Sequence, residues 1–173
     1  FVKLTGPHAV VDAQLPAFLA LCDSLRVAAT QAPAAPTEDP PGQALAWSAP
    51  PSWRPLGPRP LRLLTFGVGE ATECSLSSLS GDGGGLANNL NRWREQLGAA
   101  PLDDAAIAAL PRVRFVSQDV PLIEAAGTFT DMRGVARPGQ ARLGAIARRG
   151  EVTLFLKLVG PAGEVAGERE RFL

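Results

Sequence analysis

The stretch that decides the fold is Phe155–Leu173, FLKLVGPAGEVAGERERFL, because it repeats the beginning of the chain, Phe1–Leu19, FVKLTGPHAVVDAQLPAFL. At an offset of 154 residues the two stretches share Phe, Lys, Leu, Gly, Pro, Val, Phe and Leu, which is 8 of 19 positions without a gap. Unrelated sequences of average composition share about one position in nineteen. The shared pattern predicts a strand, a Gly-Pro break and a helix, present twice in the chain.

The repeat predicts the domain organisation. We expect residues 1–26 to be the C-terminal strand and helix of one domain copy, and residues 47–173 to be a second copy truncated in its terminal helix. Residues 27–46 are rich in Ala and Pro, which is typical of a semi-rigid linker. The alternative is a strand–Gly-Pro–helix unit that recurs within one domain, so that residues 1–25 pack in the same core. Both ends fall inside expected elements, and we expect an anchor upstream of Phe1.

Composition excludes several classes of protein. The 173 residues contain 17 Lys plus Arg and 17 Asp plus Glu, so no overall basic field attracts nucleic acid. One His and two Cys cannot complete a zinc site without carboxylates. At 46% apolar and 20% charged the chain is globular in composition. No run approaches the roughly 18 to 20 consecutive apolar residues of a membrane span.

Hydrophobic periodicity and turn residues predict an α+β fold, an antiparallel sheet with flanking helices. The clearest helix is 86–97, whose Leu86, Leu90, Trp93 and Leu97 share one face before Gly98. Arg148–Glu151 predicts a hairpin turn, and Gly160-Pro161 a break before a terminal helix. The remaining predicted elements are a helix at 103–110 and strands at 61–68, 74–79, 112–120, 122–129, 141–148 and 152–159.

The sharpest candidate site is the stretch GDGGGLANNLNRWREQLG, residues 81–98, in which three glycines lead directly into a helix. Free N–H groups and the helix dipole favour an anion at such a start. The alternative is structural: the glycines turn the chain while arginines tie neighbouring loops. The stretch contains no P-loop pair and no GxGxxG register. Residues assigned to the candidate anion site are Gly83, Gly84, Gly85, Asn91, Arg92 and Arg94.

A second set of residues is a candidate for partner binding. Trp47 and Trp53 flank a Pro-rich segment and could form an aromatic groove, although such residues also commonly cover the end of a sheet. Arg133 and Arg137 belong to a basic stretch that continues with Arg142, Arg148 and Arg149. A solvated sheet edge is the default interpretation of that stretch, and docking on an acidic partner is the alternative.

Residue types for catalysis are sparse. His8 corresponds in the second copy to Ala162, so only Lys157 or a carboxylate could act as a base there. Asp119, Glu124 and Asp131 are scattered and show no paired-carboxylate pattern. We expect no catalytic residue, no metal and no cofactor. Cys22 and Cys74 form one disulfide or remain two buried thiols, and their spacing favours two thiols.

The NRWR-Q-LG helix, together with WSAPPSW at 47–53 and FLKLVGP at 155–161, resembles a poorly characterised, envelope-associated bacterial domain family that often occurs in tandem. The motif residues are Asn91, Arg92, Trp93, Arg94 and Gln96, and the resemblance implies no catalytic residues. The order of elements is loosely similar to the Mog1/PsbP-like α/β/α sandwich. Members of that fold tend to be accessory modules of larger assemblies, although a fold does not fix a function.

These observations lead to two functional expectations. The first is a non-enzymatic, extracytoplasmic accessory module, periplasmic or membrane-anchored, that docks on protein subunits of a membrane-bound complex, with respiratory and photosynthetic complexes as candidates. The alternative is a small-ligand domain that binds an anion at the Gly83–Gly85 helix start.

Overall fold

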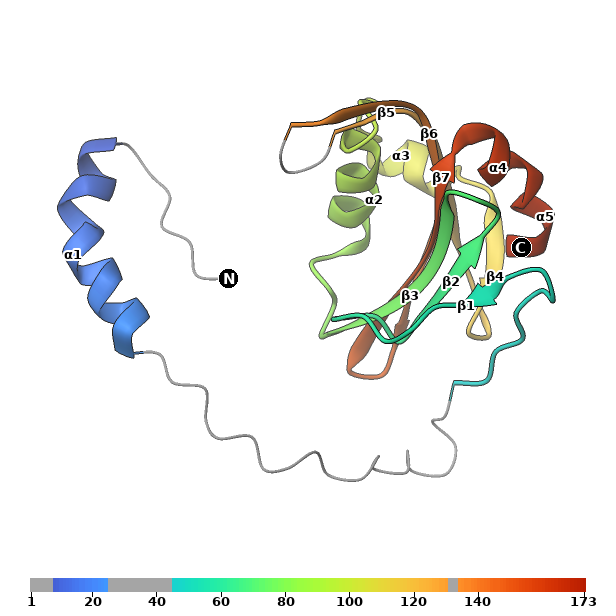
Figure 1. The fold of residues 1–173 in the computed structure, drawn as a ribbon, viewed down its shortest axis with the longest axis horizontal. Helices are drawn as coiled ribbons and strands as arrows, with labels where there is room; N and C mark the ends of the chain where they lie inside the picture. Colours follow the sequence, from blue (N-terminus) through green and yellow to red (C-terminus); the bar gives the residue numbers. More distant parts are fainter. Residues whose placement is uncertain (1–7, 25–44, 131–133) are drawn as a thin grey trace. The chain divides into compact units, whose positions relative to one another are not determined.

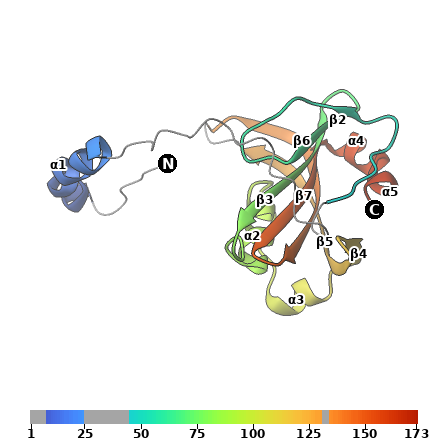
Figure 2. The ribbon, with the colours of Figure 1, turned by 90° about the horizontal axis from the view of Figure 1, so that it is seen from below.

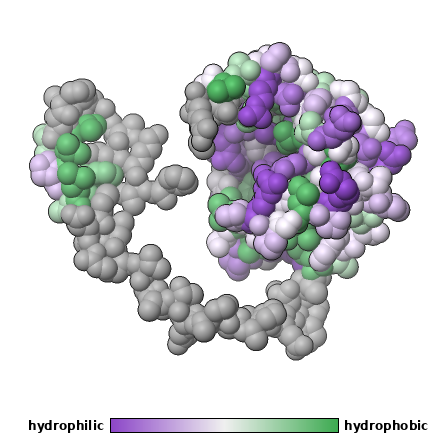
Figure 3. Space-filling view, in the orientation of Figure 1, coloured by the Kyte–Doolittle hydropathy of each residue, from purple (hydrophilic) through white to green (hydrophobic). Residues whose placement is uncertain are grey.

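The computed structural model describes residues 8–24, 45–130 and 134–173, without the side chains of 8–10, 12 and 21–24. The chain divides into two units, Phe1–Ala44 and Leu45–Leu173. The first unit contains helix α1 (His8–Ser24), in which Leu15 is 45% and Leu19 53% exposed. Apolar side chains of α1 are visible on its surface in Figure 3.

The second unit is built on one antiparallel sheet of seven strands in the order β1-β2-β3-β7-β6-β5-β4 (Figure 1). Consecutive strands are neighbours except at β3, which pairs with β7 and leaves β4 at the far edge. This confirms an α+β fold with an antiparallel sheet. The strands are β1 (Arg54–Pro55), β2 (Leu64–Val68), β3 (Thr72–Ser80), β4 (Arg112–Phe115), β5 (Gln118–Thr130), β6 (Ala136–Arg149) and β7 (Val152–Pro161).

Short helices lie on both faces of the sheet (Figures 1 and 2). The chain must cross from β3 to the far edge before β4, and α2 (Leu86–Glu95) and α3 (Asp104–Ala108) form on this crossing. The chain after β7 folds back on the opposite face as α4 (Ala162–Gly167) and α5 (Arg169–Phe172). The predicted terminal helix is therefore two short helices, with a change of direction at Glu168.

Two apolar clusters fill the spaces between the sheet and the helices. Alternation along the strands sends successive side chains to opposite faces, so each cluster takes every second strand residue. The α4/α5 face contains Trp53, Val68, Cys74, Leu122, Ala141, Leu143, Leu158, Val165 and Phe172. The α2/α3 face contains Leu90, Trp93, Ile107, Ile123, Ile146 and Phe155.

The predicted helix at 86–97 is confirmed as α2, which ends at Glu95 before Gly98 takes a left-handed φ of 71°. Leu90, Trp93 and Leu97 are buried, as the periodicity required, whereas Leu86 remains 38% exposed. The hairpin after Arg149 is also confirmed, because Gly150 adopts a φ of 58° between β6 and β7.

The strand predicted at 61–68 begins later in the structure, at Leu64. A turn closes before it, with Arg62 N–H donating to the Arg59 carbonyl at 3.2 Å. Leu61 adopts a φ of 61° and is 80% exposed, and regular pairing in β2 begins only at Leu64. The apolar run LRLL looks like a buried strand, but its first residues turn out to solvent.

The predicted strands at 112–120 and 122–129 were divided at the wrong place. β4 ends at Phe115, and a two-residue turn of Val116 (φ 45°) and Ser117 (φ 66°) leads into the long β5. Both positions need a positive φ, which hairpin turns normally fill with Asn or Gly. A β-branched residue in this conformation is a strained exception, so composition did not indicate the turn.

Candidate functional site

The glycine-rich start of α2 is held by the chain's own polar groups. Gly83, Gly84 and Gly85 have φ values of 62°, 91° and 83°, which only glycine adopts without strain. A Cβ on Gly83 would also stand 2.7 Å from the Phe155 ring. The Gly84 N–H donates to Asp82 Oδ1 at 2.9 Å, so a carboxylate of the chain already occupies this donor.

Asparagines complete this self-contained turn. The Asn89 amide donates to the carbonyls of Gly83 at 2.9 Å and Gly85 at 2.7 Å, and Asn88 donates to Gly84 at 3.1 Å. Asn89 is also buried, at 2% exposed. The loop is therefore fixed by internal hydrogen bonds from Asp82, Asn88 and Asn89.

Two other residues of the predicted anion site brace the loop after α2. The Asn91 amide donates to the Leu102 carbonyl at 2.9 Å, and Asn91 Oδ1 accepts from the Leu102 N–H at 2.7 Å. Arg94 Nε donates to the Ala100 carbonyl at 2.6 Å. Both side chains hold the connection to α3 and point to a structural role.

Arg92 is the remaining member of that predicted set, and it donates to Asn89 Oδ1. A shallow depression brings Arg92 beside Asn91, but it also contains the carboxylate of Glu95 and none of the three glycines. The six residues therefore do not surround one common space. The depression is lined by Asn88, Asn91, Arg92, Glu95, Ala99 and Pro101.

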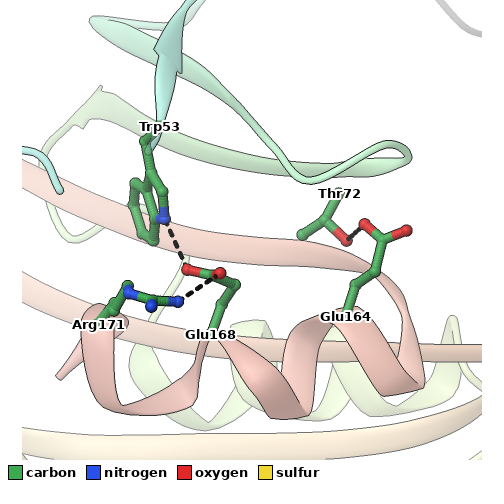
Figure 4. A network of polar contacts seen from close by, with 5 residues as sticks. All are labelled: Trp53, Thr72, Glu164, Glu168 and Arg171. Atoms are coloured by element: carbon green, nitrogen blue, oxygen red, sulfur yellow. Dashed lines mark hydrogen bonds and ion pairs between the residues drawn. The ribbon is translucent and has the colours of Figure 1, made fainter. Parts of the chain in front are cut away.

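Trp47 and Trp53, the two tryptophans predicted to bind a partner, have different environments. Trp47 is 62% exposed, whereas Trp53 is 8% exposed and packs against Phe66. Trp53 Nε1 donates to Glu168 Oε2 at 2.8 Å, and Glu168 also pairs with Arg171 (Figure 4). Trp53 is therefore a core residue that fastens the end of α4, and the two rings do not form an exposed groove.

The same face has a second carboxylate anchor (Figure 4). Glu164 on α4 accepts from Thr72 Oγ1 at 2.8 Å and from the Ala71 N–H at 3.2 Å. These hydrogen bonds, that of Thr72 first, hold the pKa of the Glu164 carboxyl below its usual value. Together with the bond of Glu168 to Trp53, they join α4 to the start of β3 and to the segment before β1.

The basic stretch is not one solvated edge. Arg137 and Arg148 are exposed, but Arg142 is only 6% exposed, which corrects the interpretation of that residue. Its burial follows from its position on β6, where it faces α2 and lies 5.7 Å from the Trp93 ring centroid. Arg133 lies outside the described residues.

Two of the scattered carboxylates form ion pairs with arginines. Asp119 pairs with Arg114 at 3.5 Å and Glu124 with Arg169 at 2.7 Å, both near the surface. Asp131 lies outside the described residues, as does the side chain of His8. In the described ranges no three His, Cys, Asp or Glu side chains gather as a metal site would require.

Sequence reasoning missed a cationic cluster on the α2 face. Lys157 on β7 faces Ser75 on β3 and Gly144 on β6, in one row across the sheet. Trp93 lies over Gly144, since a Cβ there would stand 2.9 Å from its Cε3 atom. Lys157 Nζ lies 5.7 Å from the centroid of the same ring, the same distance as Arg142 Cζ. The sequence singled out both Lys157 and Arg142, but it did not indicate that the β6–β7 register places them on the same face beside Trp93.

Burial and mutual repulsion lower the pKa of both cations. Desolvation, followed by the charges of Arg142, Arg62 and Arg92, lowers the pKa of Lys157 from 10.5 to about 8. Desolvation and Arg92 lower the pKa of Arg142 to about 10. On the other face, burial raises the pKa of Cys74, a free thiol, to about 12. The Cys22 side chain lies outside the description.

Comparisons with known proteins assign no family. The chain matches no protein-family pattern and no functionally curated protein. Solved structures do include similar chains, among them one from Bacteroides thetaiotaomicron with 13% identity and a TM-score of 0.39. The similarity covers 71% of this chain and 40% of that chain, so this chain spans less than half of that protein. A likeness this distant carries no functional argument.

None of the helices in the described part of the chain is long and apolar enough to cross a membrane.

Proposed function

We propose that residues 45–173 form a non-enzymatic interaction module that docks on a protein subunit of a membrane-bound complex outside the cytoplasm. The observation that carries this proposal is Leu61, a large apolar side chain that is 80% exposed at the tip of a turn. Exposed apolar residues that lie together are a common mark of protein contact surfaces.

The backbone conformation of Leu61 indicates that stabilisation of the fold does not explain a leucine at this position. Pro60 and Leu61 are the central residues of the turn closed between Arg59 and Arg62, and Leu61 takes a φ of 61°. A turn with Pro followed by a positive φ favours Gly or Asn at the second position. A leucine there costs stability of about 1–2 kcal/mol and leaves most of its apolar surface in water.

Two further leucines, one just before β2 and one near the end of β3, are also exposed. Leu63 is 52% exposed and hydrogen-bonds through its N–H to Leu76 at 2.8 Å, while Leu79, at the end of β3, is 40% exposed. Leu79 shares its face with Ser75, because the two differ by an even number of positions along β3. We call Leu61, Leu63 and Leu79 the leucine edge.

The repeat supports a tandem arrangement in the same proposal. The positions shared with the first nineteen residues include Phe155, Leu158, Val165 and Phe172, which are 0 to 8% exposed in the second unit. The first stretch thus repeats the core pattern of β7, α4 and α5. We retain the envelope-associated tandem family, the Mog1/PsbP-like sandwich and the extracytoplasmic location as parts of this proposal.

The experiment is recovery of partners from native membranes with the full chain and with Leu61→Gly. The glycine variant relaxes the turn, so it should fold at least as stably while losing about tenfold or more of its partner binding. Leu173→Ser is the matched control, because Leu173 is 48% exposed at the end of α5 on the opposite face. Equal recovery by the wild type and Leu61→Gly, or no membrane protein recovered at all, would refute the proposal.

A further inference from the structure

Within the described residues, no carboxylate forms an ion pair with the cationic cluster on the α2 face. Lys157 and Arg142 lie on adjacent strands beneath Trp93, and Arg92 on α2 adds a third positive charge close enough to lower the pKa of both. The ion pairs of the described residues include none of these three cations. Glu73, on the same sheet face, is already held by Arg59 at 3.0 Å and Arg62 at 2.9 Å.

Arg142 also has an unmet hydrogen bond. Its Nη1 donates to Gln96 Oε1 at 2.8 Å and to the Trp93 carbonyl at 3.3 Å, but its buried Nε–H has no acceptor among the residues that the structure describes. A buried donor without a partner costs about 1–3 kcal/mol, and more when the group is charged. Within the described ranges this side chain, 94% buried, therefore keeps one donor that a bound acceptor could use.

Lys157 is similarly incomplete. Its Nζ contacts the Trp93 ring but hydrogen-bonds to no acceptor in the ranges that the structure describes. Ser75 stands directly opposite Lys157 on β3 and contributes a hydroxyl donor to the same row. An ammonium, a guanidinium N–H and a hydroxyl thus come from three adjacent strands, β7, β6 and β3.

Lys157 is also one of the positions shared by the two copies of the sequence repeat. Of the eight positions shared between the first and last nineteen residues, Lys3 and Lys157 form the one charged pair. Burial explains the shared Phe and Val positions and Leu158, and backbone geometry explains Gly160. Core packing does not require an amino group at Lys157, whose burial lowers its own pKa.

We propose that this cluster binds an oxyanion, a carboxylate or a phosphate group, between Lys157 Nζ, Arg142 Nε and Ser75 Oγ. Charge-assisted hydrogen bonds to such a ligand are short and strong, and they would neutralise the repulsion among the three cations. The site is separate from the predicted one at Gly83–Gly85, and it does not depend on docking through the leucine edge.

The sequence offers a direct probe, because Lys3 and Lys157 are its two lysines. The full chain with isotope-labelled lysine is titrated by NMR with inorganic phosphate and, separately, with acetate, at ionic strength held constant by sodium chloride. Binding should shift the Lys157 side-chain signal saturably and raise its pKa above 8, while Lys3 provides the internal control. Response to phosphate alone, to acetate alone or to both supports the site and identifies its ligand class.

Two variants distinguish anion binding at this site from non-specific electrostatic attraction to the protein's positive charges. Ser75→Ala keeps all three cations and should weaken anion binding about tenfold, as expected for one lost hydrogen bond to a charged ligand. Arg149→Gln removes a positive charge at the far end of β6 and should leave the affinity unchanged. The proposal is overturned if Lys157 and Lys3 shift equally, if neither saturates at millimolar anion, or if Arg149→Gln weakens binding as much as Ser75→Ala.

Discussion

Replacing Gly160 with alanine should test how tightly β3 and β7 approach each other. A Cβ at this position would lie 2.7 Å from Thr72 Cα, whereas ordinary contacts begin at 3.4 Å. The two backbones would therefore have to separate by about 0.7 Å. Thr72 cannot easily move aside, because it is 2% exposed and its hydroxyl is bonded to Glu164 at 2.8 Å.

We expect Gly160→Ala to lower the free energy of unfolding by about 3 kcal/mol, the upper end of overpacking effects. For a domain of this size the melting temperature should fall by roughly 10 °C. Gly163→Ala is the matched control: it lies in α4 with open space around it, so alanine should stabilise by about 0.5–1 kcal/mol.

Urea unfolding followed by tryptophan fluorescence measures both variants, and an unchanged m-value shows that the difference lies in stability. The reasoning is refuted if Gly160→Ala loses less than about 1 kcal/mol, because β3 and β7 would then separate without resistance. It also fails if the two alanine variants change stability in the same direction.

Three further changes test the charged and polar contacts. Lys157 has a pKa of about 8 in the folded state and an ordinary value of 10.5, so the folded state binds fewer protons between these pH values. The free energy of unfolding should therefore rise from pH 8 to 9. Lys157→Met should abolish that rise in a series of urea titrations. Above pH 9 the raised pKa of Cys74 acts oppositely, because only the unfolded thiol then loses its proton. Glu164, whose pKa is lowered chiefly by the Thr72 hydroxyl, contributes stability that is complete above pH 4.5 and lost as pH falls through its folded pKa; in acid titrations Glu164→Gln should show a smaller loss than the wild type. Trp53→Phe removes the indole hydrogen bond to a carboxylate and should lower the unfolding free energy by about 2 kcal/mol, and a loss below about 0.5 kcal/mol in urea unfolding would contradict its anchoring role.

The sequence predicted the elements whose signals are local. The α2 helix follows from apolar spacing that ends at Gly98, and the β6–β7 hairpin follows from Gly150 between two apolar runs. Gly160-Pro161 likewise marks the passage from strand to helix. In each case one residue type supplies a backbone conformation that its neighbours cannot, so the prediction needed no tertiary information.

The features that escaped prediction depend on contacts made far along the chain. Leu61 and Val116 adopt positive φ values that their residue types disfavour, so composition indicated a continuing strand at both places. Arg142 and Lys157 meet because β6 and β7 pair in one register, with Gly144 opposite Lys157. A basic stretch read without that register resembles an exposed edge, and only the sheet shows that one of its arginines is buried.

The strand order has a consequence for how the domain assembles. β1 to β3 are neighbours in sequence and space, and so are β4 to β7, whereas β3 and β7 join residues more than 70 positions apart, such as Ser80 and Val152. Such distant pairing raises contact order and slows folding. We therefore expect the β1–β3 and β4–β7 strand groups to form early and the β3–β7 pairing to form last. The connection that contains α2 links the two groups and limits how far apart they can move before they pair.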